Sequence, residues 1–184
     1  MQHLGTVSQQ TPRLVLRRFA VQDAEKMYQN WCSDPQVTKY LMWPTHDSVD
    51  VTKQVLEDWV GHYGEPNYYH WAITLREGGE PIGSIGVMRQ DDCTQMAHIG
   101  YCIGQKWWRQ GYTSEALAAV MRFLFHEVGV NRVESRHDPR NPNSGRVMQK
   151  CGMKYEGTLR EADWNNQGIC DCAMYAILKS EYGG

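Results

Sequence analysis

The stretch KWWRQGYTSEALAAVMRFLFHEV, residues 106–128, joins a basic turn containing Gly111 to a long helical pattern. Apolar side chains recur along it at the spacing of one helix face, at Leu117, Val120, Met121, Leu124 and Val128. The first turn of a helix exposes backbone N–H groups, the helix dipole adds roughly half a positive charge there, and a glycine lets backbone approach a ligand closely. The stretch therefore predicts an amphipathic helix packed on a sheet, with a start suited to a pyrophosphate; an ordinary strand-to-helix connection is the alternative.

Length and composition indicate one globular domain spanning residues 1–184. Hydrophobic residues make up 41% and charged residues 22% of the chain, both close to globular averages. The net charge is −2 and no basic stripe is present, which argues against a nucleic-acid partner. The sequence has neither a long apolar segment nor the features of a signal peptide, so we expect a cytoplasmic protein with no membrane partner.

The six cysteines lack the spacing of a metal site or a disulfide framework. Cys170 and Cys172 alternate as two residues on one strand face would, and no histidine lies at metal-ligand spacing from them. We expect reduced thiols and no metal.

The pattern of hydrophobic residues and turns predicts an α/β (α+β) domain. We expect strands over 13–18, 68–75, 81–90, 95–104, 131–137, 154–160 and 169–178. We expect helices over 23–31, 49–62, from Gly111 onward, and over 141–152. The three consecutive strands between the second and third helices should form an antiparallel meander. The whole would be a mixed, mostly antiparallel sheet of about seven strands flanked by helices.

Four stretches, in this order along nearly the whole chain, resemble the GCN5-related N-acetyltransferases (GNAT family), and within them the RimJ/RimL-type ribosomal-protein-alanine N-acetyltransferase branch. They are TPRLVLRRF, HIGYCIGQKWWRQGYTSEAL, RNPNSGRVMQKCGM and YEGTLREADW. The resemblance implies the GNAT fold, acetyl-CoA as co-substrate, no metal, and transfer of an acetyl group to a primary amine.

The same resemblance assigns residues to acetyl-CoA. The family's loop, Q/R-x-x-G-x-G/A, falls on residues 108–113, where Trp108 and Thr113 depart from the pattern and Arg109 would supply the missing charge. The strand would present its backbone to the pantetheine arm where it splays from its neighbour. The expected cofactor-binding residues are Cys102, Ile103, Gly104, Arg109, Gln110, Gly111, Tyr112, Thr113, Ser114 and Asn141.

An amine must be neutral to attack a thioester, so a base is needed. A protein α-amine titrates near ~8 and a lysine near ~10.4, so the α-amine needs only a modest base. His98 stands where the family often carries a strand glutamate, and a histidine pKa near ~6.5 suits the task. A packed or surface histidine is the competing interpretation. Other candidate bases are Tyr69, His70, Glu80 and Asp163.

The leaving thiolate needs a hydrogen-bond donor. The family often uses a tyrosine where this chain has Met148, and in the related branch Ser144 takes that role. We expect the Ser144 hydroxyl to hydrogen-bond the sulfur. Asn141 should contact the pantetheine or thiol, although an asparagine before Pro142 is also a good helix N-cap.

The segment 160–168 contains the expected loop between the last two strands, residues 161–168, where the family places part of its acceptor groove. Asp163 and Trp164 are the candidate substrate contacts; a polar hairpin with Trp164 packed under it or at a dimer contact is the alternative. The acceptor could be a protein N-terminal α-amine, a polyamine, an aminoglycoside or an amino acid. The other functional classes are a non-catalytic acyl-CoA-binding module and an interaction protein that uses only the fold. We expect the protein to be a monomer or a homodimer.

Overall fold

The computed structural model describes residues 1–183. Its strands are β1 (Gln9–Gln10), β2 (Leu14–Arg17), β3 (His70–Leu75), β4 (Pro81–Asp91), β5 (Met96–Ile103), β6 (Arg132–His137), β7 (Lys154–Asn165) and β8 (Gly168–Leu178). Its helices are α1 (Ala24–Met27), α2 (Pro35–Thr38), α3 (Val49–Gly61), α4 (Tyr112–Phe123) and α5 (Pro142–Lys150). Shorter or wider helical turns are η1 (Val21–Asp23), η2 (Tyr28–Cys32), η3 (His62–Gly64), η4 (Gln105–Trp107) and η5 (Leu124–Val128).

The strands of residues 1–183 form one eight-stranded sheet in the order β1-β2-β3-β4-β5-β6-β8-β7. Strands β3, β4 and β5 make the expected antiparallel meander. Within the described chain, β5 and β6 are the one parallel pair. The predicted mixed, mostly antiparallel sheet flanked by helices is confirmed, with the two-residue β1 as an additional strand.

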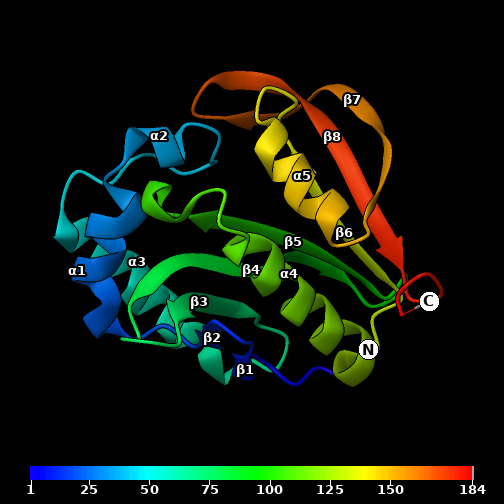
Figure 1. Ribbon diagram of the computed structural model, residues 1–184, viewed down its shortest axis with the longest axis horizontal. Coiled ribbons are helices and arrows are strands. Elements are labelled where there is room, and N and C mark those ends of the chain that lie inside the picture. Colours follow the sequence, from blue (N-terminus) through cyan, green and yellow to red (C-terminus); the bar gives the residue numbers. More distant parts are fainter. Residues whose placement is uncertain (184) are drawn as a thin grey trace.

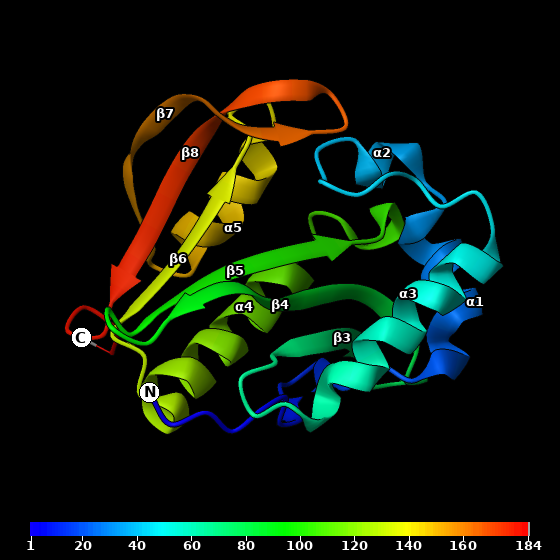
Figure 2. The ribbon, with the colours of Figure 1, turned by 180° about the vertical axis from the view of Figure 1, so that it is seen from behind.

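Helices cover both faces of the sheet (Figures 1 and 2). The apolar stripe of α4 and η5 packs on one face, where Leu117, Val120 and Leu124 are fully buried with Trp71 and Ile73 of β3. Helix α5 lies on the same face over β6 and β8. On the opposite face α1 and α3 enclose a second cluster around Trp31 and Leu56. The quoted helix therefore anchors the larger core, as its periodicity predicts.

Two element boundaries differ from the sequence prediction. The helix expected over 23–31 is divided into η1, α1 and η2. The expected loop 161–168 is mostly strand, because β7 runs to Asn165 and pairs with β8 around a bulge: Leu159 faces Cys172 and Asp163 faces Cys170. Three residues on β7 thus oppose the single Asp171. Polar side chains on this exposed edge strand gave no alternating pattern, so the strand was not evident.

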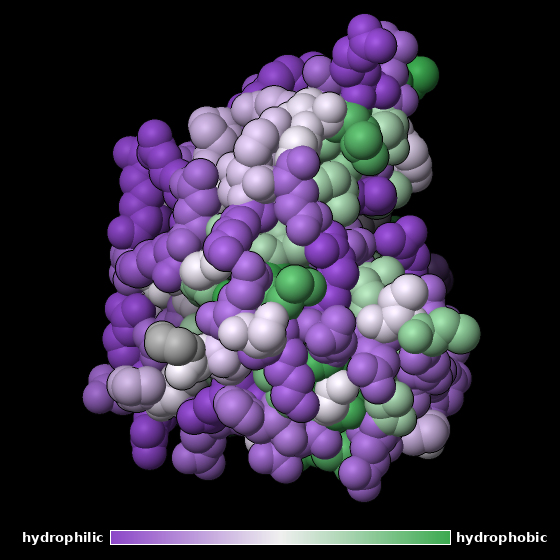
Figure 3. Space-filling model, turned by 90° about the vertical axis from the view of Figure 1, so that its right-hand side faces the viewer, coloured by the Kyte–Doolittle hydropathy of each residue, from purple (hydrophilic) through white to green (hydrophobic). Residues whose placement is uncertain are grey.

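The surface beside the chain ends is mostly hydrophilic, with hydrophobic residues in separate patches (Figure 3). Several exposed apolar side chains belong to the edge hairpin: Tyr155, Leu159, Trp164 and Ile169. None of the helices in the described residues is long and apolar enough to span a bilayer.

Candidate active site

The candidate site begins where β5 and β6 separate. They pair over only three positions, Met96 with Arg132, Ala97 with Val133 and His98 with Glu134, while β5 continues to Ile103 and β6 to His137. The Ser135 hydroxyl then donates a 2.7 Å hydrogen bond to the Ile99 carbonyl. Beyond that bond the two strands diverge (Figure 2). The gap leaves one edge of β5 free of a strand partner from Gly100 onward.

Backbone register decides which groups of β5 face this gap. Gly104 N–H donates to the Ile82 carbonyl of β4, 2.9 Å away. Because hydrogen-bonding groups alternate between the two edges of an antiparallel strand, Cys102 also faces β4, while Tyr101 and Ile103 face the gap. The Ile103 carbonyl accepts from the indole of Trp108 at 2.8 Å. Of the three residues expected to present backbone groups to the gap, only Ile103 does so. Tyr101 also presents its backbone there, and the alternation of the strand could have identified it.

The turn before α4 has the conformation of a close-approach loop. Arg109 and Gly111 have φ angles of 61° and 83°, in the left-handed region. Gly111 is the N-cap residue of α4, and no side-chain cap bond is made there. The N–H groups of the first turn, from Tyr112 to Ser114, are therefore available to an anion.

Two cations that sequence reasoning missed flank this turn. An added Cβ on Gly111 would lie 3.5 Å from both the Arg13 guanidinium and the Lys150 ammonium. Arg13 is fixed by an ion pair with Glu115 (2.7 Å) and donates to the Gln110 carbonyl at 3.0 Å. Lys150 comes from the last turn of α5. Arg13 lies far from the loop in sequence, so only the fold shows that its charge is part of the site.

The start of α5 lies across the gap from β5. The Ser144 hydroxyl donates to the Tyr101 hydroxyl at 3.2 Å, and the Tyr101 hydroxyl donates to the Ser144 carbonyl at 2.8 Å. Burial raises the pKa of Tyr101, which stays a neutral phenol. Asn141 precedes Pro142 at the N-cap position, but its side chain makes no cap bond. The Asn141 amide is thus free of the capping role that its sequence context predicted.

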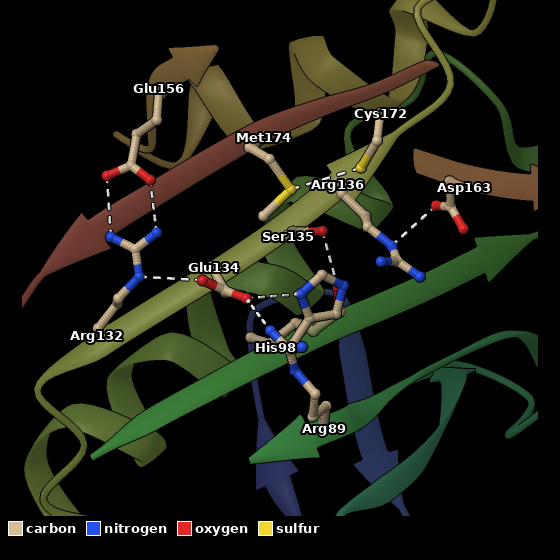
Figure 4. A network of polar contacts seen from close by, with 11 residues as sticks. Arg89, His98, Arg132, Glu134, Ser135, Arg136, Glu156, Asp163, Cys172 and Met174 are labelled. Carbon is tan, nitrogen blue, oxygen red and sulfur yellow. Dashed lines mark hydrogen bonds and ion pairs between the residues drawn. The ribbon is translucent and has the colours of Figure 1, made fainter. Parts of the chain in front are cut away.

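His98 lies at the vertex of the gap, on the face opposite α4. Its ring is buried, and Nδ1 lies 3.2 Å from Glu134 Oε1 (Figure 4). With the proton on Nδ1 it donates to Glu134, which leaves the Nε2 lone pair free to accept a proton. Burial lowers the pKa of His98, and the bond to Glu134 opposes that shift. The arrangement favours a neutral imidazole at neutral pH.

Glu134 holds His98 within a larger ion-pair network. Its carboxylate also contacts Arg89 at 3.1 Å and Arg132 at 3.0 Å, and Arg132 pairs with Glu156 (Figure 4). Although burial opposes ionisation, these partners hold the pKa of Glu134 below its usual range. Sequence reasoning missed Glu134, because the contact depends on the β5–β6 register.

Asp163 faces the same side of the sheet. It lies within β7, where the bulge ends, rather than in the expected loop, and its carboxylate is 2.9 Å from Arg136 Nε (Figure 4). Trp164, the next residue, is 53% exposed. Neighbouring Asn166 donates to the carbonyls of Thr38 and Trp43, both at 2.8 Å. The hairpin tip thus joins the segment after α2.

The other candidate bases are occupied or remote from the gap. His70 is enclosed by Trp59 and Phe19, and burial lowers its pKa to about 4. Tyr69 is hydrogen-bonded to His3, and Glu80 lies beside Asn30 and Lys26. His98, by contrast, lies at the last β5–β6 pair, with Nδ1 directed at Glu134.

No cluster of three or more potential metal ligands occurs among the described residues. All six cysteines are free thiols, as expected. Burial raises the pKa of Cys102, so the cysteine next to the gap is a poor nucleophile.

Comparison with known proteins identifies the architecture. A family model described as the acetyltransferase (GNAT) domain matches residues 13–154. The uncharacterised N-acetyltransferase p20 of Bacillus licheniformis is 32% identical over 177 residues, 95% of this chain and 97% of that protein. The ribosomal protein uS5-alanine N-acetyltransferase of Escherichia coli is 33% identical over 64 residues, 35% of this chain and 33% of that enzyme. A GNAT-family acetyltransferase structure from Bacillus anthracis has a TM-score of 0.84 at 26% identity, covering 95% of this chain and 100% of that one.

Proposed function

The chain belongs to the GNAT acetyltransferase family, and from that membership we propose that it acetylates a primary α-amine, of a protein N-terminus or a small molecule, in a ternary complex with acetyl-CoA. The observation that carries the proposal is the gap between β5 and β6. It places a free strand edge, a cationic helix start and a neutral histidine around one opening. These are the three elements that the reaction requires.

The residues present fit acetyl-CoA. The first-turn N–H groups of α4, together with Arg13 and Lys150, offer positive charge to a pyrophosphate. The backbone groups of Tyr101 and the N–H of Ile103 would hold the amide-containing pantetheine arm, with the Asn141 amide at the start of α5. When bound, acetyl-CoA supplies a thioester carbonyl that an amine can attack.

His98 would accept the proton that the amine must lose. Its Nε2 lone pair is available because Nδ1 is directed at Glu134. A general base of this kind contributes typically about 10²- to 10⁴-fold to a rate. Glu134 acts as a positioning residue, because it fixes the ring orientation and tautomer and touches no reacting atom.

Ser144 would donate a hydrogen bond to the departing sulfur. In the structure its hydroxyl instead donates to Tyr101, so it must rotate to do so. Tyr101 cannot easily replace it, because its own proton is directed at the Ser144 carbonyl. The pair also joins β5 to α5 across the gap.

Two measurements test the proposal in sequence. Saturating acetyl-CoA should raise the melting temperature, since a ligand at 100 times its dissociation constant adds ~2.7 kcal/mol of stability. Acetylation of a panel of amines should then be followed by mass spectrometry. A thiol-reactive dye that detects the released CoA would also react with the exposed Cys93, so mass spectrometry is the more suitable method.

An unchanged melting temperature would contradict acetyl-CoA binding and favour an interaction protein that uses only the fold. A raised melting temperature without acetylation of any amine would identify a non-catalytic acyl-CoA-binding module.

A further inference from the structure

Arg136 occupies a position that the proposed reaction does not use. It lies on β6 two residues beyond Glu134, so its side chain shares the face of the sheet that carries Glu134 and His98. It also lies past the last β5–β6 pair, where the gap has opened. Figure 4 shows its guanidinium on the His98 side of the sheet, between His98 and Asp163. A cation is therefore present where an acceptor amine would approach the base.

Arg136 differs from the other arginines around this face in its hydrogen bonding. Arg89 and Arg132 donate to Glu134, and Arg140 donates to Asp138. Arg136 makes an ion pair through Nε with Asp163, but within residues 1–183 its guanidinium meets no acceptor with hydrogen-bond geometry. Its side chain is 34% exposed, whereas that of Asp163 is 14% exposed. The two terminal nitrogens are consequently available to a ligand.

The acids on this face offer no comparable site for a second cation. The side chains of Glu134 and Asp138 are 7% and 2% exposed, and each already accepts from at least one arginine. Asp163 is held by Arg136. Glu156 is more exposed, at 44%, but both of its oxygens already accept from another arginine. A polyamine or aminoglycoside carries several positive charges. Arg136 would repel those charges, and the side chains of Glu134, Asp138 and Asp163 are less exposed than that of Arg136.

We propose that Arg136 binds a carboxylate on the acceptor, and that the acceptor is therefore a small amine carrying a carboxylate, of the α-amino acid class. A guanidinium presents parallel N–H groups that match the two oxygens of a carboxylate, and such paired bonds are about twice as strong as neutral ones. Asp163 holds Arg136 by its Nε edge, which leaves the end with two terminal nitrogens for this contact. This inference rests on the proposed acetyl transfer and names its substrate class.

The hairpin tip supports a small acceptor over a folded protein. Asn166 bonds the carbonyls of Thr38 and Trp43, and its own N–H donates to the Leu41 carbonyl at 3.1 Å. The tip belongs to β7 and β8, on the β6 side of the gap. The segment after α2 belongs to the β5 side, because the preceding turn η2 packs against η4, which follows β5. The contact therefore joins the two sides of the gap across the acceptor face. A compact ligand passes such a bridge more readily than a protein chain with its folded domain attached.

Matched acceptors test the inference on the full-length protein. L-amino acids, their C-terminal amides and short peptides starting with the same residue would be acetylated by the wild type and by Arg136→Gln, Arg136→Lys and the exposed control Arg160→Gln. We expect the wild type to favour the free amino acid over its amide by at least about 10-fold in kcat/KM. Arg136→Gln should lower kcat/KM for the amino acid by about 10- to 100-fold, chiefly through KM, and leave the amide within about 3-fold.

Arg136→Lys keeps the charge but not the paired donors, so its kcat/KM for the amino acid should lie between those of the wild type and Arg136→Gln. This variant provides the test if Arg136→Gln fails to fold. Equal use of amide, peptide and free amino acid by the wild type would overturn the inference, as would an equal loss on all three in Arg136→Gln. So would acetyl-CoA binding with no amino acid acetylated. Failure to bind acetyl-CoA by calorimetry would instead overturn the proposed function itself.

Discussion

The two faces of the gap between β5 and β6 are built in different ways. On the α4 side, the site is mainly backbone from one short segment, the end of β5 through the first turn of α4, with Arg13 and Lys150 beside it. On the opposite side it consists of side chains from different strands, His98, Glu134, Arg136 and Asp163, joined by ion pairs. A backbone site is damaged mainly by added atoms, and a side-chain site by removed polar groups. Substitutions on the α4 side should therefore lower acetyl-CoA affinity, whereas substitutions on the opposite side should lower turnover or change its pH dependence.

The largest effect should come from Gly111→Asp on the backbone face. The new Cβ would sit 3.5 Å from Arg13 and Lys150, and its carboxylate would take the place offered to the pyrophosphate. Like-charge contact costs several kcal/mol, so calorimetry should show acetyl-CoA affinity reduced by about 100-fold or more.

Gly129→Asp is the matched control. Gly129 has a similar φ of 79° just beyond the far end of the same helical segment, with no heavy atom within 4 Å of an added Cβ. Both variants should lose about 1–2 kcal/mol of stability to left-handed strain, but only the first should lose affinity. Equal affinities in the two folded variants would place the anion elsewhere.

His98→Gln should mainly affect turnover. We expect a loss of roughly 100-fold in kcat at neutral pH with acetyl-CoA affinity nearly intact, because the base is removed and the backbone face is unchanged. In the wild type, kcat should rise with pH as His98 becomes neutral, and the lowered pKa of His98 puts that limb below the usual histidine range. The variant should lack this limb, and its defect should shrink as higher pH supplies neutral amine.

The exposed His126→Gln variant controls for histidine loss in general. A His98→Gln enzyme with the wild-type pH profile would remove His98 from the mechanism and leave the cofactor face as described.

Ser144→Ala tests the side-chain contact between β5 and α5. Losing a hydrogen bond to the sulfur should lower kcat about 10-fold at every pH, and an acyl donor with a more acidic thiol should partly restore the rate. Tyr101→Phe is the comparison, because it removes the bond to the Ser144 carbonyl and keeps the serine. If both variants lose the same activity and neither responds to the thiol, Ser144 acts only by holding α5.

The smallest change in rate should come from Glu134→Gln, with a diagnostic change in pH profile. The Glu134 carboxylate raises the pKa of His98 against burial, so its removal should move the acidic limb of kcat to still lower pH. We expect a rate loss of about 10-fold or less, since Glu134 orients the imidazole by one hydrogen bond and touches no reacting atom. An acidic limb that stays in place would show that the imidazole is oriented by other contacts.

Much of the backbone face could be predicted from the sequence. The helix start, its glycine and the preceding strand are contiguous, so period and composition indicate them locally. The acceptor face could not be predicted in the same way. His98 was identified, but its partner Glu134 depends on a parallel register between strands separated by α4. Asp163 was assigned to a loop because the bulge at Glu161 breaks the alternation of β7.

The sequence by itself determined the amphipathic helix, the meander and the glycine turn at the helix start, because each follows from the periodicity or conformational freedom of neighbouring residues. Only the tertiary structure decided which charges meet. Arg13 and Lys150 converge on one helix start, and Arg136 lies on the face of the buried histidine–glutamate pair with its terminal nitrogens unpaired within residues 1–183. The physical reason is that these contacts act over a few ångströms between elements far apart along the chain. Strand order and register set those distances, and no local pattern encodes them.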